Sequence, residues 1–252
     1  MRTDRIRSIA LVIASAAVTL LVAAPAGAGT PEQRFSASVS PARAGTRAAP
    51  APVRLAVRLS FDGLSDAPPF STRQVSLWFD RGLVFNGAAF PTCRASVVAA
   101  SFGARCPKGS KVGTGTARGV AIGIVEDLTL TVFNGPAGTV EIFVFAAGPL
   151  VVNSVIQAPL RRRTGAYGYR LDVPIPRGLQ VPYEGITAAL TDFRVKVGGT
   201  LRRRVRSNGR TVTRTVSYLG LARCSGRSLG FAFTGSYSDG SSQSGTTKQP
   251  CS

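Results

Sequence analysis

Apolar and polar residues alternate along most of the chain after residue 30. In Val53–Phe61, valine, leucine and phenylalanine occupy every second position, and arginine and serine lie between them. A period of two is typical of a strand that buries one face. Gln74–Asp80 repeats this alternation, and we expect it to lie beside Val53–Phe61 in the sheet.

The same pattern predicts strands over much of the remaining chain, separated by short glycine- and proline-rich turns. They are Arg34–Ser40, Leu128–Phe133, Thr139–Ala146, Val151–Gln157, Tyr167–Val173, Ile186–Val197, Leu201–Arg206, Thr211–Ala222 and Leu229–Tyr237. Asn134–Gly138 has the composition of a hairpin turn. Ala95–Ser101 is the one segment that favours a helix. These elements predict an all-β antiparallel fold that is sandwich-like or, alternatively, a partly closed β-barrel, with at most one short helix.

One hairpin combines a strong turn signal with many basic residues. Asn208-Gly209 favours a two-residue turn, which sets Arg203 opposite Arg214. Six side chains then share one face of the hairpin: Arg202, Arg204, Arg206, Thr211, Thr213 and Thr215. Forked guanidinium donors and hydroxyls on a rigid ladder suit phosphate, sulfate or carboxylate groups along a polymer. The alternative is a solvated hairpin whose charge prevents edge-to-edge aggregation.

The N-terminus has the pattern of an export signal. Three arginines precede the apolar run Ile9–Ala24, and Ala26-Gly27-Ala28 supplies the small residues that a signal peptidase accepts. We predict that residues 1–28 are a signal peptide and that residues 29–252 form a single secreted all-β domain, with a Pro/Ala/Gly-rich stretch at 41–52. The alternative, an uncleaved anchor, would need a longer apolar run to span a bilayer. We expect no transmembrane segment after signal removal.

The chain has four cysteines, which can form three different pairs of disulfides. Export to an oxidising compartment favours disulfides over metal ligands or a nucleophilic thiol. We predict the bonds Cys93–Cys106 and Cys224–Cys251, because each then closes one short segment.

The formal net charge is +19, from 31 basic and 12 acidic residues. This excess indicates a polyanionic partner, which we expect to be an anionic cell-wall or surface polymer and not a specific nucleic acid. Arginine far outnumbers lysine, so GC-rich coding is an alternative source of the charge.

The chain contains no histidine, which removes the usual general base of serine and cysteine hydrolases and the commonest zinc ligand. Glycoside hydrolysis needs only two converging carboxylates, and Glu126, Asp127 and Glu184 are the candidates for it. Adjacent residues such as Glu126 and Asp127 point to opposite faces of a strand. Gly113–Gly119 has the first two glycines of a dinucleotide-binding loop, but it lacks the third glycine and the helix that follows such a loop. We expect no metal and no cofactor.

Three segments together resemble a family of exported bacterial proteins of unassigned function. They are Val39–Thr46, Phe90-Pro91-Thr92-Cys93 with Cys106–Gly115, and Tyr237-Ser238-Asp239-Gly240 with the chain to Cys251. The resemblance implies a secreted β-rich domain with two disulfides, and it carries no catalytic residue. We therefore expect a secreted, surface- or wall-associated, non-catalytic structural or binding module; the alternative is an extracellular carbohydrate-active hydrolase.

Overall fold

The computed structural model describes residues 32–62, 70–207 and 210–252. The predicted signal peptide and the turn Asn208-Gly209 lie outside the described residues. No helix in the described ranges has the length and hydrophobicity to cross a membrane.

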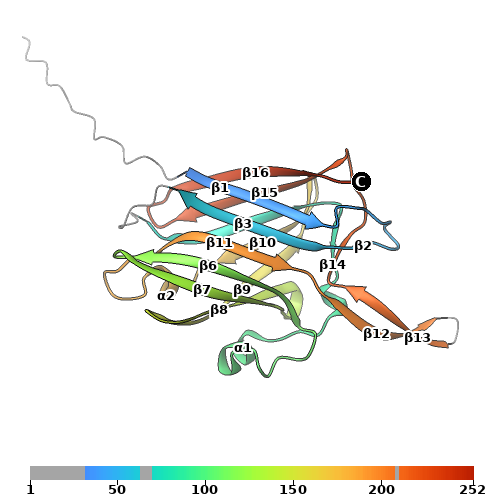
Figure 1. Ribbon diagram of the computed structural model, residues 1–252, viewed down its shortest axis with the longest axis horizontal. Helices are drawn as coiled ribbons and strands as arrows, with labels where there is room; N and C mark the ends of the chain where they lie inside the picture. The colour runs from blue at the N-terminus through green and yellow to red at the C-terminus, as the bar shows by residue number, and fades with distance from the viewer. Residues whose placement is uncertain (1–31, 63–69, 208–209) are drawn as a thin grey trace, which may run out of the picture. The chain divides into compact units, whose positions relative to one another are not determined.

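Eleven strands form one large sheet in which every neighbouring pair is antiparallel (Figure 1). In spatial order they are β1 (Glu32–Ser40), β3 (Arg54–Asp62), β11 (Ala189–Val197), β6 (Lys111–Ala121), β7 (Ile124–Asn134), β8 (Thr139–Ala147), β9 (Val151–Arg162), β10 (Tyr167–Pro174), β4 (Thr72–Asp80), β15 (Ser228–Tyr237) and β16 (Ser242–Pro250). The two edge strands, β1 and β16, lie beside each other. The sheet is therefore nearly closed into a barrel.

The seam between β1 and β16 follows from the odd number of strands. Eleven strands that alternate in direction begin and end with the same direction, so β1 and β16 are parallel and do not continue the antiparallel ladder. The Gln249 side chain bridges them instead: its amide oxygen accepts from the Val39 N–H (2.6 Å), and its amide nitrogen donates to the Val39 carbonyl (2.8 Å). One side chain thus satisfies a backbone donor and acceptor at the edge of the sheet.

Two small sheets and a few short helices complete the fold. A three-stranded sheet contains β2 (Ala51–Pro52), β14 (Leu219–Leu221) and β5 (Leu83–Phe85). The hairpin of β12 (Thr200–Ser207) and β13 (Arg210–Ser217) projects from the large sheet (Figure 1). The helical segments are α1 (Ala95–Ser101), α2 (Arg177–Gln180) and two single 3₁₀ turns, η1 (Gly87–Ala89) and η2 (Pro136–Gly138).

The predicted all-β antiparallel fold is confirmed, and the arrangement is the partly closed barrel of the two alternatives. The predicted helix forms as α1. A second, four-residue helix, α2, was not predicted, because one helical turn has no periodicity to detect.

The strand assignment differs from the prediction in several details, and β2, β5 and β6 lie outside the predicted strand ranges. Strand β4 pairs with β10 and β15 and not with β3, because pairing partners depend on how the chain returns to the sheet. The segment predicted as one strand over Thr211–Ala222 is divided between β13 and β14, which belong to different sheets. Strand β16 was not predicted, because its sequence is almost entirely polar; its pairing with β15 makes it a strand.

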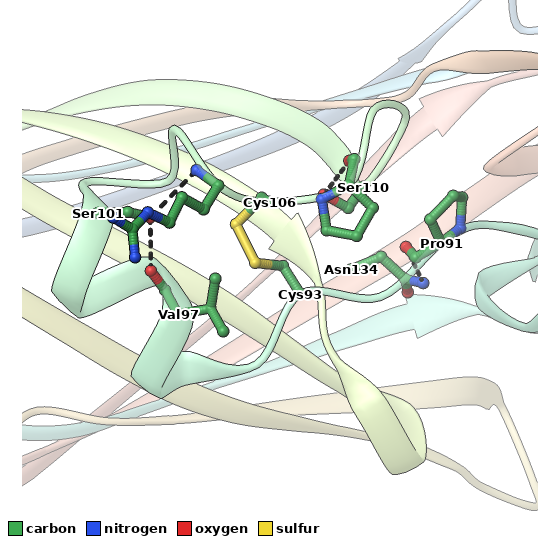
Figure 2. The surroundings of a disulfide bond; sticks show 9 residues. Pro91, Cys93, Val97, Ser101, Cys106, Ser110 and Asn134 are labelled. Carbon is green, nitrogen blue, oxygen red and sulfur yellow. Dashed lines mark hydrogen bonds between the residues drawn. A yellow bond between two sulfur atoms is a disulfide. The ribbon is translucent and has the colours of Figure 1, made fainter.

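Both predicted disulfides, Cys93–Cys106 and Cys224–Cys251, are present. The first joins the start of the α1 segment to the chain that leads into β6 (Figure 2). Asn134 fixes the same segment to β7: its buried amide nitrogen lies within 3.0–3.3 Å of the carbonyls of Gly87, Phe90 and Pro91. The α1 segment thereby covers Phe133 and Phe143, on the outer face of the sheet.

The interior of the barrel is apolar, but its two sides differ in residue type. Near the seam, aromatic side chains pack against one another: the ring centroids are 4.9 Å apart for Phe35 and Phe233 and 4.9 Å apart for Phe70 and Tyr237. The opposite side, under β6 to β9, presents mainly alanine, valine, leucine and isoleucine. This difference determines where the interior is filled and where it is hollow.

Candidate functional site

An apolar cavity of about 130 Å³ lies inside the barrel. Its lining comes from β3, β4 and β6 to β11, together with α2 and the chain beside it. Among the described residues that line it, Phe193 is the one aromatic residue, and Thr72 and Glu126 are the only ones with polar side chains. An engineered protein cavity of about 150 Å³ stays dry and binds benzene, so this cavity has room for a ring or for a segment of an alkyl chain.

Glu126 is a buried carboxyl group in the wall of this cavity. It lies on β7 and is 5% exposed. Its Oε2 accepts a hydrogen bond from the Leu150 N–H (2.7 Å), whereas its Oε1 is buried and has no hydrogen-bond partner among the described residues. A buried polar atom without a partner destabilises a fold by about 1–3 kcal/mol, and native structures contain few of them.

The cavity opens at the end of the barrel where β6 turns into β7. Ile124 and Gly178, at this end, are lining residues that are also exposed to solvent. The turn between β8 and β9 lies at the same end, because β7 and β8 are joined by η2 at the other end. Helix α2 lies near the ends of β6 and β7 (Figure 1) and contributes Leu179 to the lining.

Exposed apolar side chains gather in the segments around this opening. Those of Ile122, Val125, Val151 and Tyr183 are all more than one third exposed, and Ile122 and Val151 reach 64% and 79%. Ile122 also has a φ of 44° in the two-residue turn of the β6–β7 hairpin. A β-branched residue is unfavourable in this left-handed region, where Asn or Gly is usual. An apolar side chain is thus held in solvent despite a conformational cost.

A second candidate site lies on the outer surface of the barrel, over β1, β3, β11 and β6. A groove of about 410 Å³ runs across these strands. We define the basic face as the exposed cations there: Arg54, Arg58, Arg118, Arg194 and Lys196. Hydroxyl side chains lie among them: Ser36, Ser38, Thr114 and Thr116.

Two aspartates offset part of this charge. Asp192 forms ion pairs with both Arg58 (3.2 Å) and Arg194 (2.7 Å), and Asp127 pairs with Arg118 (2.8 Å). The hydrogen bond from Arg118 lowers the pKa of Asp127, so this carboxylate stays ionised to lower pH than usual. The basic face therefore has more cations than anions, and carboxylates hold Arg58, Arg118 and Arg194 in position.

The arginine hairpin has the predicted register. Arg203 lies opposite Arg214, and Arg202, Arg204 and Arg206 lie opposite Thr215, Thr213 and Thr211. Of the six predicted face residues, all except Arg206, whose side chain is not described, are exposed. Leu201 and Val216, at the base of the hairpin, pack against the core. The hairpin is therefore anchored at its base and exposed beyond it.

The three carboxylates considered for glycoside hydrolysis lie in different surroundings. Glu126 faces the interior and Asp127 faces solvent, as the alternation along a strand predicts. Glu184 is exposed in the chain that follows α2. A further buried carboxyl group, Glu141, lies on β8 directly before the cavity-lining residue Ile142 and is not itself in the lining. Its Oε1 lies 2.8 Å from the Thr139 hydroxyl.

The glycine-rich segment Gly113–Gly119 is part of a strand, β6, and is closely approached by its neighbour β11. A Cβ atom at Gly115 would collide with the Arg194 carbonyl oxygen, whereas one at Gly119 would meet its nearest atom at 3.6 Å. Gly115 therefore serves strand packing, whereas Gly119 borders the cavity. Among the described residues, no three metal-ligating side chains form a cluster.

Sequence reasoning did not find the cavity or the basic face. Glu126 was one of three candidate acids for glycoside hydrolysis, and the arginines of β3 were predicted on the polar face of their strand without being linked to the cations of β11. The sequence signal for the basic face was that basic and hydroxyl residues recur at alternate positions, on the exposed face, in three separate strands. Its meaning depends on the sheet order, which places those strands side by side.

Comparison of this chain with protein-family models, with curated proteins and with solved structures found no match. The resemblance to exported bacterial proteins therefore stays a prediction.

Proposed function

We propose that this protein is a secreted, non-catalytic binding module that takes an apolar ligand into the barrel. The observation that carries the proposal is the internal cavity, which is lined by aliphatic side chains and opens at one end of the sheet. Ligand pockets are typically concave, mostly apolar and supplied with very few polar groups. Export is supported by the signal-like N-terminus and is compatible with the two disulfides.

The apolar surroundings of the opening support the same function. A ligand with low solubility in water needs a path that is itself apolar, and the exposed side chains near the opening supply one. The conformation of Ile122 adds to this argument, because backbone strain is concentrated at functional positions.

Toluene is a suitable probe for the proposed site, because it is uncharged and cannot bind through the basic surface. We expect toluene to raise the midpoint of thermal unfolding and to bind with a measurable heat in a calorimeter. Ala117 lines the cavity, so an Ala117→Leu variant should bind toluene at least about tenfold more weakly because its side chain occupies the space. Ala56→Leu, on the outer face of β3, is the matched control. Equal toluene binding by both variants would place the ligand elsewhere.

A second function, contact with an anionic wall or surface polymer, is favoured by the basic face. Its cations and hydroxyls lie on adjacent strands of a rigid sheet, where the spacing of donors is fixed. The arginine hairpin is the competing location for the same contact. The two surfaces are separate, so substitutions distinguish them.

Binding to polygalacturonate, a uronic-acid polymer, at several salt concentrations tests this second function. We expect affinity to fall as salt rises, since polymer counterions are released on binding. An Arg194→Ser/Lys196→Ser variant should weaken binding and reduce the salt dependence, while Arg202→Ser/Arg204→Ser/Arg206→Ser should not. The reverse result would assign the contact to the hairpin, and no binding by the unmodified protein would contradict the function.

A further inference from the structure

The one buried carboxyl group in the described lining of the cavity indicates which kind of apolar molecule fits it. We infer that the ligand is an apolar alcohol or phenol whose hydroxyl group hydrogen-bonds to Glu126. This inference rests on the proposed function, because it assumes that the cavity holds a ligand. It adds the chemical class of that ligand and the residue that selects it.

The argument starts from the two oxygens of Glu126. Oε2 is occupied by the Leu150 N–H, which belongs to the turn between β8 and β9. Oε1 has no partner in the described part of the chain and is buried. A carboxyl oxygen shielded from water needs a replacement for the lost hydrogen bonds of water. No side chain of the described lining donates to Oε1, so a molecule held in the cavity is the remaining source of a partner.

The hydroxyl group is the ligand group that suits this oxygen best. A hydroxyl donates to a carboxylate and also accepts from a carboxylic acid, so it satisfies Oε1 in either state of Glu126. An ionised ligand carboxylate would be repelled by an ionised Glu126. A pure hydrocarbon would fill the apolar space and leave Oε1 without a partner.

Glu126 also has a structural role, since it holds the β8–β9 turn through Leu150. A simple loss of binding in a Glu126 variant would therefore be ambiguous. The ratio of two affinities avoids this ambiguity. A disturbed turn weakens the binding of both ligands, whereas a lost hydrogen bond weakens only the binding of the ligand that carries a hydroxyl group. Phenol and toluene form a matched pair, since they differ by a hydroxyl in place of a methyl group.

The experiment measures phenol and toluene binding by calorimetry to the unmodified protein, to Glu126→Leu and to Glu126→Gln. We expect the unmodified protein to bind phenol at least as tightly as toluene. Glu126→Leu should keep toluene binding and lose at least about tenfold in phenol affinity. Glu126→Gln still accepts from Leu150 and still offers a polar partner, so it should retain most of the preference for phenol.

The outcomes separate this inference from the proposed function. If toluene binds and the phenol-to-toluene ratio is the same in the unmodified protein and in Glu126→Leu, the cavity is a ligand site but Glu126 does not select alcohols. If neither compound binds to the unmodified protein, the proposed function is wrong and this inference is wrong with it. Should Glu126→Leu fail to fold, the unmodified protein and Glu126→Gln are compared instead. The inference is contradicted if the ratio of phenol affinity to toluene affinity in the unmodified protein is well below one and is no higher than in Glu126→Gln.

Discussion

The two sides of the barrel interior differ in how completely side chains fill them. Near the seam of β1 and β16, the space is filled by aromatic rings: Phe233 contacts Phe35, and Tyr237 contacts Phe61 and Phe70. Under β6 to β9 the inward positions are small or aliphatic, and a cavity remains. Dense packing stabilises the first side, while the second gives up packing energy and leaves the space that the proposed ligand would occupy.

The largest expected effect comes from emptying the filled side. Phe233 is almost fully buried, so Phe233→Ala should reduce the free energy of unfolding by about 3–5 kcal/mol. Phe193→Ala is the matched change on the hollow side. It should cost less than about 3 kcal/mol, because Phe193 is only partly buried and already borders empty space. Denaturant unfolding of both variants measures the difference, and equal losses would show that the two sides are packed alike.

Alkaline pH should also act on the aromatic packing. Burial raises the pKa of Tyr218 from 10.0 to about 12. The unfolded phenol ionises near pH 10 while the folded one stays neutral, so its contribution to stability is complete below pH 10 and is lost between pH 10 and 12. The loss amounts to about 2–3 kcal/mol. The free energy of unfolding, measured by denaturant titration at several pH values, should fall less steeply between pH 10 and 12 in Tyr218→Phe. An unchanged pH profile in this variant would exclude Tyr218 as the cause of the decline.

Substitutions at two glycines of β6 allow a closely packed strand contact to be compared with the cavity wall. Gly115→Ala should cost about 1–3 kcal/mol, because its Cβ would collide with the Arg194 carbonyl. Gly119→Ala has room for its methyl group and should change stability by less than about 1 kcal/mol. Thermal unfolding monitored by circular dichroism tests both. A large loss for Gly119→Ala would mean that the cavity wall is as tightly packed as the strand contact.

The smallest effect should be a gain. If the cavity is empty in the unliganded protein, Ala117→Leu buries additional methylene groups in existing space and should raise stability by about 1 kcal/mol. The measurement is the free energy of unfolding without toluene. A loss of stability would indicate that the space is too narrow at Ala117 for the longer side chain.

Much of the local structure was predictable from the sequence because it depends on neighbours along the chain. Alternation identified most strands, and Asn208-Gly209 set the register that pairs Arg203 with Arg214. The disulfides followed from the short segments that they close. The polar strand β16 gave no such signal, since its pairing with β15 and not its composition makes it a strand.

The functional surfaces depended on the tertiary structure. The sequence alone determined that the chain is β-rich, strongly basic and without histidine, because composition and periodicity are local properties. Only the closure of eleven strands decided that Glu126 borders a cavity and that Arg58 lies opposite Arg194. The physical reason is that a cavity and a charged face both arise from residues distant in sequence, whose proximity is set by strand order.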